Sequence, residues 1–173
     1  MVNSRTAVEV SGQVDRPTYY ITPVGEWVNY ERGVSAGGIA PIDKGEVARF
    51  LTESQLGRLS TDRLRAYGLG NLTTDRNQRM VEKMMEGDHL VFYFDKMLRS
   101  MGRVVQVVES EDLSLWLFGD RRYKFVVFLD DFRELGLPAS TMAESLYGKG
   151  DGVVRGLRRL NELNGTKLEG LLG

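Results

Sequence analysis

Two neighbouring runs of strand-forming residues constrain the fold of this chain more than any other feature. Residues 87–94 read Gly-Asp-His-Leu-Val-Phe-Tyr-Phe, and residues 102–108 read Gly-Arg-Val-Val-Gln-Val-Val. The short polar segment between them is typical of a turn, so the two runs are predicted to be adjacent antiparallel strands. A third run at 123–129 is apolar almost throughout, which predicts a strand buried on both faces. The middle of the chain is therefore expected to form a curved sheet or small barrel.

Shorter patterns before and after this core predict helices. Residues 19–22 form a strand that Pro23 ends, and residues 25–33 resemble one or two helical turns closed by a glycine. Residues 43–69 have a mainly helical pattern, Asp75 and Gln78 have the spacing of a capping box, and the last dozen residues indicate an amphipathic helix. Residues 113–120 are too short and too glycine-bounded to be a good helix, and Trp116 and Phe118 would share a face if the segment were extended.

The chain of 173 residues fits one α+β domain. Residues 1–17 are interpreted as a flexible leader or edge strand, and residues 18–173 as the domain, with a helical insert at about 40–75. A long apolar run and a signal peptide are both missing, so we expect no membrane partner and a cytoplasmic location.

Composition argues against most enzymatic chemistry. The sequence contains no cysteine and one histidine, His89, which excludes disulfides and thiolate sites and leaves little material for histidine triads or metal clusters. The carboxylates are scattered, and no phosphate-binding glycine motif is present. We therefore expect a protein that is not an enzyme and that needs no cofactor.

Local positive charge beside aromatic residues is the remaining functional signal. The net charge is −1, so any contact with nucleic acid must depend on a local patch. Arginine and lysine neutralise phosphates, and an aromatic ring can stack on an unpaired base for about 1–3 kcal/mol. Tryptophans are more often core residues, and charged runs are more often plain surface. The basic candidates are Arg121, Arg122, Lys124, Lys149, Arg155, Arg158 and Arg159, and the first of them closely follow Trp116 and Phe118.

The order of several local patterns resembles the PUA-like superfamily, in particular its EVE and YTH branch. The resemblance covers roughly residues 18–172, and each pattern is short, so the order carries the argument. The matching pieces are Tyr19-Tyr20-Ile21, the Glu31-Arg32-Gly33-Val34 turn, residues 86–93, residues 102–108, residues 123–135 and residues 156–162.

This resemblance implies a compact curved sheet flanked by helices, with a pocket for a modified base flipped out of its strand. Trp116 falls at the place of one tryptophan of the family's aromatic cage, whereas the place of another is taken by Ser35. Thr22 and Ser35 are the candidates for reading the base edge, and the arginines would hold the backbone. The remaining candidates for the pocket are Tyr20, Trp27, Tyr30 and Phe118.

Three functions stay open at this point. The first is a reader of DNA that carries N6-methyladenine or methylcytosine, like the N-terminal domains of McrB-type restriction enzymes, acting with an attached AAA+ motor or nuclease. The second is an RNA-binding module for tRNA or rRNA. The third is an interaction domain without affinity for nucleic acid. The sequence does not choose the base, the polymer or the oligomeric state.

Overall fold

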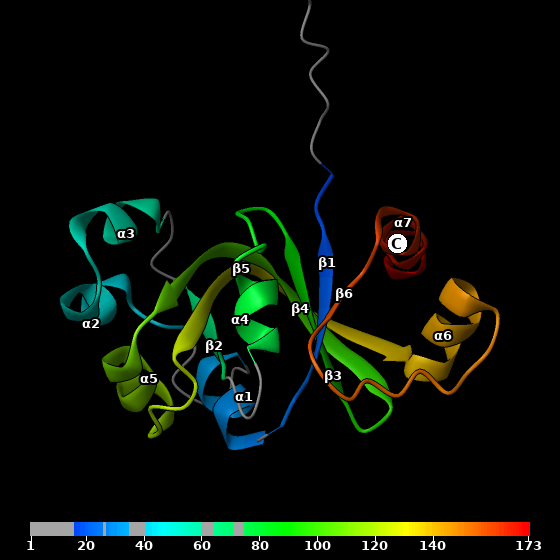
Figure 1. Ribbon diagram of the computed structural model, residues 1–173, viewed down its shortest axis with the longest axis horizontal. Helices are drawn as coiled ribbons and strands as arrows, with labels where there is room; N and C mark the ends of the chain where they lie inside the picture. Colours follow the sequence, from blue (N-terminus) through cyan, green and yellow to red (C-terminus); the bar gives the residue numbers. More distant parts are fainter. Residues whose placement is uncertain (1–15, 26, 35–40, 60–63, 71–74) are drawn as a thin grey trace, which may run out of the picture.

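A twisted six-stranded sheet forms the centre of the protein. The computed structural model describes residues 16–25, 27–34, 41–59, 64–70 and 75–173. Within these residues the strand order is β2-β5-β4-β3-β1-β6, with β2 and β6 at the two edges, so the sheet is open and does not close into a barrel. The α+β class and the curved mixed sheet predicted from the sequence are confirmed (Figure 1).

Strand pairing is mixed in direction. β1 runs parallel to β3, and the other pairs in the sheet are antiparallel. The predicted hairpin is present, with a two-residue turn at Asp95 and Lys96, both of which have positive φ. The strands are β1 Tyr19–Pro23, β2 Arg65–Leu69, β3 His89–Phe94, β4 Met97–Glu109, β5 Phe125–Pro138 and β6 Arg158–Arg159.

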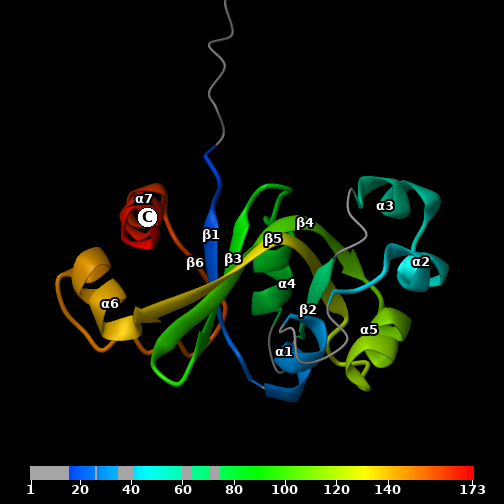
Figure 2. The same ribbon diagram turned by 180° about the vertical axis from the view of Figure 1, so that it is seen from behind.

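Helices cover both faces of the sheet and both of its ends. α6 and α7 lie together at one end, and α2, α3 and α5 lie at the other, with α1 and α4 between them (Figures 1 and 2). None of the described helices is long and apolar enough to cross a membrane. The helical elements are α1 Trp27–Gly33, α2 Lys44–Val47, η1 Ala48–Phe50, α3 Glu53–Arg58, α4 Arg76–Val81, α5 Glu111–Phe118, α6 Ala139–Tyr147 and α7 Glu162–Leu172.

The first half of β5 is buried on both faces, as its apolar sequence predicts. Phe125, Val127 and Leu129 pack in the core shared with α1 and α4. Val126 and Phe128 point to the opposite face and pack with α5 and the segment around α2 and α3. A third core lies between β1, β3, α6 and α7. Apolar burial on both faces fixes β5 in the middle of the sheet.

Two predicted secondary-structure assignments are wrong. Residues 65–69, expected at the end of a helix, form strand β2, which pairs antiparallel with β5. Residues 111–118 form helix α5, although residues 113–120 were expected not to make a good helix. The Ser110 hydroxyl accepts a hydrogen bond from the Leu113 amide and caps this helix, and Gly119 ends it at a φ of 73°.

One strand boundary and one helix cap also differ from the prediction. β5 continues past Asp130 and Asp131 to Pro138 and pairs with β4 along its length. α4 begins after Asp75 as expected, but the Asp75 side chain makes no capping hydrogen bond. The capping-box spacing therefore predicted where the helix starts, but not how its first backbone amides are capped.

Candidate nucleic-acid interface

A cavity of about 630 Å³ opens beside the carboxyl end of β1. Its walls come from β1, β2, α1, α4, the segment before β5 and the segment before β6. This volume lies in the range of small-molecule sites, about 300–1,000 Å³. The side chains that give the cavity its chemistry are the aromatic Tyr67 and Tyr123, the polar Thr22, Asn29 and Asn77, and the basic Arg76, Arg122 and Arg155.

Tyr67 forms a fixed aromatic wall of this cavity. It lies on β2, is 5% exposed, and packs edge-on against Phe92 with 5.0 Å between the ring centroids. Its hydroxyl donates a long hydrogen bond, 3.5 Å, to the Pro23 carbonyl at the end of β1. The ring is therefore held from β3 on one side and from β1 on the other.

Tyr123 provides the second aromatic ring, from the segment that enters β5. Its ring packs edge-on against Phe118, with centroids 6.2 Å apart, and is half-buried. Gly68 of β2 lies directly beneath it, because a Cβ atom built at Gly68 would be 2.6 Å from the Tyr123 Cβ. A larger residue at 68 could not be accommodated without moving Tyr123, so glycine sets the approach of this ring to β2.

Neutral polar groups complete the inner wall. Thr22 is 2% exposed and its hydroxyl donates to the Pro23 carbonyl at 3.3 Å. Asn29 lies on α1 and is 7% exposed, and Asn77 of α4 donates to the Gly70 carbonyl. Hydroxyl and amide groups both donate and accept hydrogen bonds, which suits them to the mixed donor and acceptor edge of a nucleobase.

Three arginines and no carboxylate belong to the described lining, so the cavity favours an anionic or electron-rich ligand. Arg76 donates to the Leu157 carbonyl at 3.3 Å, which joins α4 to the segment before β6. Arg155 lies on that segment and is exposed. A phosphate beside the cavity could be held by such groups.

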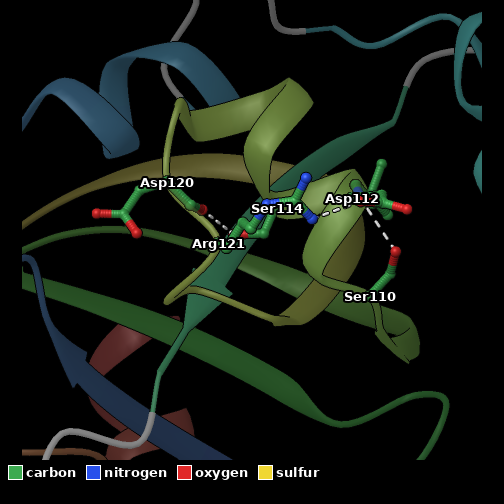
Figure 3. Close-up of polar contacts among 6 residues, drawn as sticks. Ser110, Asp112, Ser114, Asp120 and Arg121 are labelled. Atoms are coloured by element: carbon green, nitrogen blue, oxygen red, sulfur yellow. Dashed lines mark hydrogen bonds and ion pairs between the residues drawn. The ribbon is translucent and has the colours of Figure 1, made fainter.

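Arg122 lies in a turn that is fixed to α5. The hydroxyl of the buried Ser114 donates to the Asp120 carbonyl, as Figure 3 shows. The Asp120 carboxylate then accepts from the Arg122 backbone amide at 2.8 Å and from its guanidinium at 2.6 and 2.7 Å. These hydrogen bonds lower the pKa of Asp120 below its ordinary value. Arg121 in the same turn pairs instead with Asp112 of α5, at 2.5 Å (Figure 3).

Of the seven residues predicted to form a base pocket, Thr22 lines the cavity. Tyr20 and Tyr30 are buried in the core around α1 and α4, and Phe118 is buried in the core around α5, behind Tyr123. Ser35 and the side chain of Trp27 lie outside the described residues. Of the five predicted pocket residues whose side chains are described, Thr22 alone belongs to the lining of this cavity.

Trp116 lies elsewhere, on the side of α5 that faces η1. Its ring is half-buried, with its centroid 5.6 Å from that of Phe50, and the Arg49 guanidinium lies 5.6 Å from it. It is absent from the described lining of the cavity, where Tyr123 is the aromatic residue from this region. An extended segment would have carried Trp116 and Phe118 on one face, but the helix rotates the two rings apart.

The predicted backbone contacts divide in the same way. Arg122 and Arg155 line the cavity. Lys124 pairs with Glu109 at 3.1 Å, and Arg158 donates to the Tyr147 hydroxyl at 3.4 Å. Arg159 borders a second hollow of about 390 Å³ between the start of β1 and α7. Lys149 is exposed and belongs to the lining of neither this hollow nor the cavity beside β1. That second hollow is lined by two carboxylates, Glu162 and Glu169, and by Arg16 as well as Arg159.

Sequence reasoning did not identify Tyr67, Tyr123, Asn29, Asn77 and Arg76 as site residues. Gly68 and Gly70, between which strand β2 ends, were a usable signal, because glycines in a strand often mark a close backbone approach. Within the described residues, no cluster of histidine and carboxylate side chains could hold a metal ion.

Comparison with solved structures gives a match at the level of the fold. No protein-family model and no curated protein matches the sequence. Among solved structures, the chain is similar to the N-terminal domain of Thermococcus gammatolerans McrB bound to m5C DNA, with a TM-score of 0.65 and 14% sequence identity. The match covers 90% of this chain and 96% of the other, so the two share one fold across nearly their whole length. The chain thus has the fold of this McrB N-terminal domain, the kind of domain that the sequence resemblance predicts.

Proposed function

We propose that this protein is a non-catalytic reader of modified DNA, and that the cavity beside β1 receives the modified base after it has been flipped out of the duplex. The observation that carries the proposal is the composition of this cavity. It combines two aromatic rings, Tyr67 and Tyr123, with neutral polar groups and basic side chains. The fold relative that binds m5C DNA supports the same class of ligand.

Each part of the cavity has a place in this proposal. Flipping a base breaks its stacking and pairing at a cost of a few kcal/mol, which new contacts must offset. Tyr67 and Tyr123 would cover the faces of the base and the added methyl group, and Thr22 with the two asparagines would read its edge. Arg76, Arg122 and Arg155 would hold the adjoining phosphates.

The modified base is methylcytosine or N6-methyladenine in this proposal, and methylcytosine is the first to test because the fold relative binds m5C DNA. A cytoplasmic restriction system would use such a reader to direct an attached AAA+ motor or a nuclease to modified sites. The reader itself carries out no chemistry, so its effect is measured as binding.

A binding titration tests the proposal directly. Labelled duplexes with methylcytosine, with N6-methyladenine and without modification would be titrated with the wild-type protein by fluorescence anisotropy, with matching RNA duplexes and single strands in parallel. We expect one modified DNA to bind more tightly than its unmodified form. Equal affinity for every DNA would contradict the proposal, and tighter binding of RNA would favour an RNA-binding module.

Two aromatic substitutions locate the pocket. Tyr123→Ala removes a wall of the cavity, whereas Trp116→Ala removes a half-buried ring outside it. A lost stacking contact of about 1–3 kcal/mol corresponds to roughly 5- to 150-fold weaker binding. We expect that loss for Tyr123→Ala with the modified duplex and little change for Trp116→Ala. The reverse result would place the base at Trp116.

A further inference from the structure

We propose that Asp120 is a positioning residue that holds the Arg122 guanidinium at the mouth of the cavity, ready to contact the phosphate beside the bound base. The inference rests on the proposed function, since it concerns how that site is prepared for its ligand. It assigns a role to a carboxylate that would otherwise be expected to repel nucleic acid.

The Asp120 carboxylate fixes Arg122 at two points. One oxygen accepts from the Arg122 backbone amide at 2.8 Å, and the other accepts from Nε and Nη2 of the guanidinium at 2.7 and 2.6 Å. Backbone and side chain of one residue are thus held by one acidic group. Such charge-assisted bonds restrict the guanidinium to one direction, which lowers the ordering cost of a later phosphate contact.

Asp120 is itself held from inside the protein. Ser114 is fully buried on α5, and its hydroxyl donates to the Asp120 carbonyl (Figure 3). On the other side, the carbonyl oxygen of Arg122 packs on Gly70, where a Cβ atom would come within 2.5 Å of it. The turn is therefore fixed between α5 and the end of β2. Because Asp120 belongs to this fixed turn, its carboxylate also holds the Arg122 guanidinium in one place.

The neighbouring pair Asp112 and Arg121 provides a matched comparison. It has the same ion-pair chemistry, at 2.5 Å, and also joins α5 to this turn. Arg121 does not belong to the cavity lining, whereas Arg122 does. If only net charge mattered, neutralising either aspartate would strengthen DNA binding equally, because each substitution removes one negative charge near the ligand. Positioning predicts opposite results for the two substitutions.

The experiment compares Asp120→Asn, Asp120→Glu and Asp112→Asn in the full chain, using the labelled modified and unmodified duplexes. We expect Asp112→Asn to tighten both duplexes slightly and to leave their ratio unchanged. Asp120→Asn should weaken the modified duplex roughly 13- to 160-fold, which corresponds to loss of one charge-assisted contact. Asp120→Glu keeps the charge and should restore part of the affinity.

Salt dependence separates positioning from a general loss of structure. Loss of one phosphate contact should reduce the slope of log affinity against log salt by about 0.9 for Asp120→Asn. The slope for Asp112→Asn should stay at the wild-type value, and thermal melting should show both variants folded. An Asp120→Asn variant that follows Asp112→Asn in affinity and slope would overturn the inference alone. A wild type without preference for modified DNA would overturn the proposed function and, with it, this inference.

Discussion

The carbonyl oxygen of Arg122 lies so close to Gly70 that a methyl group placed on this glycine would be 2.5 Å from it. Gly70 directly follows β2, and Arg122 belongs to the turn between α5 and β5. Two segments that are distant in sequence therefore meet through backbone atoms at the edge of the cavity. This contact sets how far Arg122 and Tyr123 reach over the cavity.

Substitution Gly70→Ala should therefore disturb the cavity more than the overall fold. The turn must shift to relieve the contact, and overpacking of this kind costs roughly 1–3 kcal/mol of stability. We expect a folded protein whose affinity for the modified duplex falls about tenfold or more. Gly136→Ala is the control, since a methyl group there meets no atom within 4 Å. Equal affinity of the two variants would show that the turn does not contribute to binding.

The Thr22 hydroxyl is a second point of test, because Thr22 is the one predicted pocket residue with a described side chain that lines the cavity. Thr22→Val keeps the β-branched shape that suits strand β1 and removes the hydroxyl alone. Loss of one hydrogen bond to the base, about 0.5–1.5 kcal/mol, should weaken the modified duplex roughly 2- to 13-fold. Thr22→Ser keeps the hydroxyl and should bind nearly as well as wild type. Anisotropy titration distinguishes them, and unchanged affinity in both would exclude Thr22 from base reading.

A buried hydroxyl pair should control stability without touching the cavity lining. The hydroxyls of Tyr30 and Ser100 lie 2.5 Å apart and join α1 to β4. Tyr30→Phe leaves the Ser100 hydroxyl in the core without this partner, which costs about 1–3 kcal/mol. Urea unfolding should show that loss, and the double variant with Ser100→Ala should lose less than the sum of the two single variants. Additive losses would mean that the pair contributes no coupling energy.

Histidine 89 should give the unfolding free energy a defined pH dependence. Burial lowers the pKa of His89 below its ordinary value of 6.5, although the nearby Asp88 and Glu169 partly oppose this. Below pH 6.5 the unfolded chain therefore binds a proton on His89 more readily than the folded chain does. The contribution of His89 to the free energy of unfolding is complete above pH 6.5 and is lost as the pH falls below it.

The matched variant for this effect is His89→Phe. Its ring can keep the stacking on Tyr19, where the centroids lie 4.9 Å apart, but it does not titrate. Since His89 is the only histidine of the sequence, wild type should lose stability relative to this variant between about pH 6.5 and 5. Denaturant titrations across that range check it, and parallel curves for the two proteins would refute the assignment.

Local sequence patterns were enough to predict the central strands and the last helix. Residues 89–94 and 125–129 combine the strand period with strong apolar character, and helix α7 has apolar positions at helical spacing. The resemblance to PUA-like proteins placed these elements in one fold, and the shared fold with a McrB N-terminal domain confirms that prediction.

Long-range pairing explains the elements that were missed. Strand β2 is a strand because β5 lies beside it, Tyr67 opposite Val127, and no local pattern of residues 65–69 contains that information. Helix α5 buries Leu113, Leu117 and Phe118 while Leu115 is exposed, so its apolar residues do not form a clean helical stripe.

The candidate site could not be assembled from sequence for the same reason. Tyr67 comes from β2, Tyr123 precedes β5, and Thr22 lies near the end of β1. The three side chains share a cavity although three strands separate β2 from β1 in the sheet, because the curvature of the sheet brings the Tyr67 hydroxyl to the Pro23 carbonyl. The family position of Trp116 led instead to a ring that packs beside Phe50.

The long pairing of β4 with β5 has a mechanical consequence. These two strands extend from the core around α5, where Glu109 pairs with Phe125, to the end where Met97 pairs with Pro138 and α6 begins. Amide groups at both ends of the protein thus belong to one long strand pair, whose register shifts at three places along its length. Exchange of these amides with solvent should occur through the same opening event, which makes the two ends one cooperative unit rather than separately melting halves.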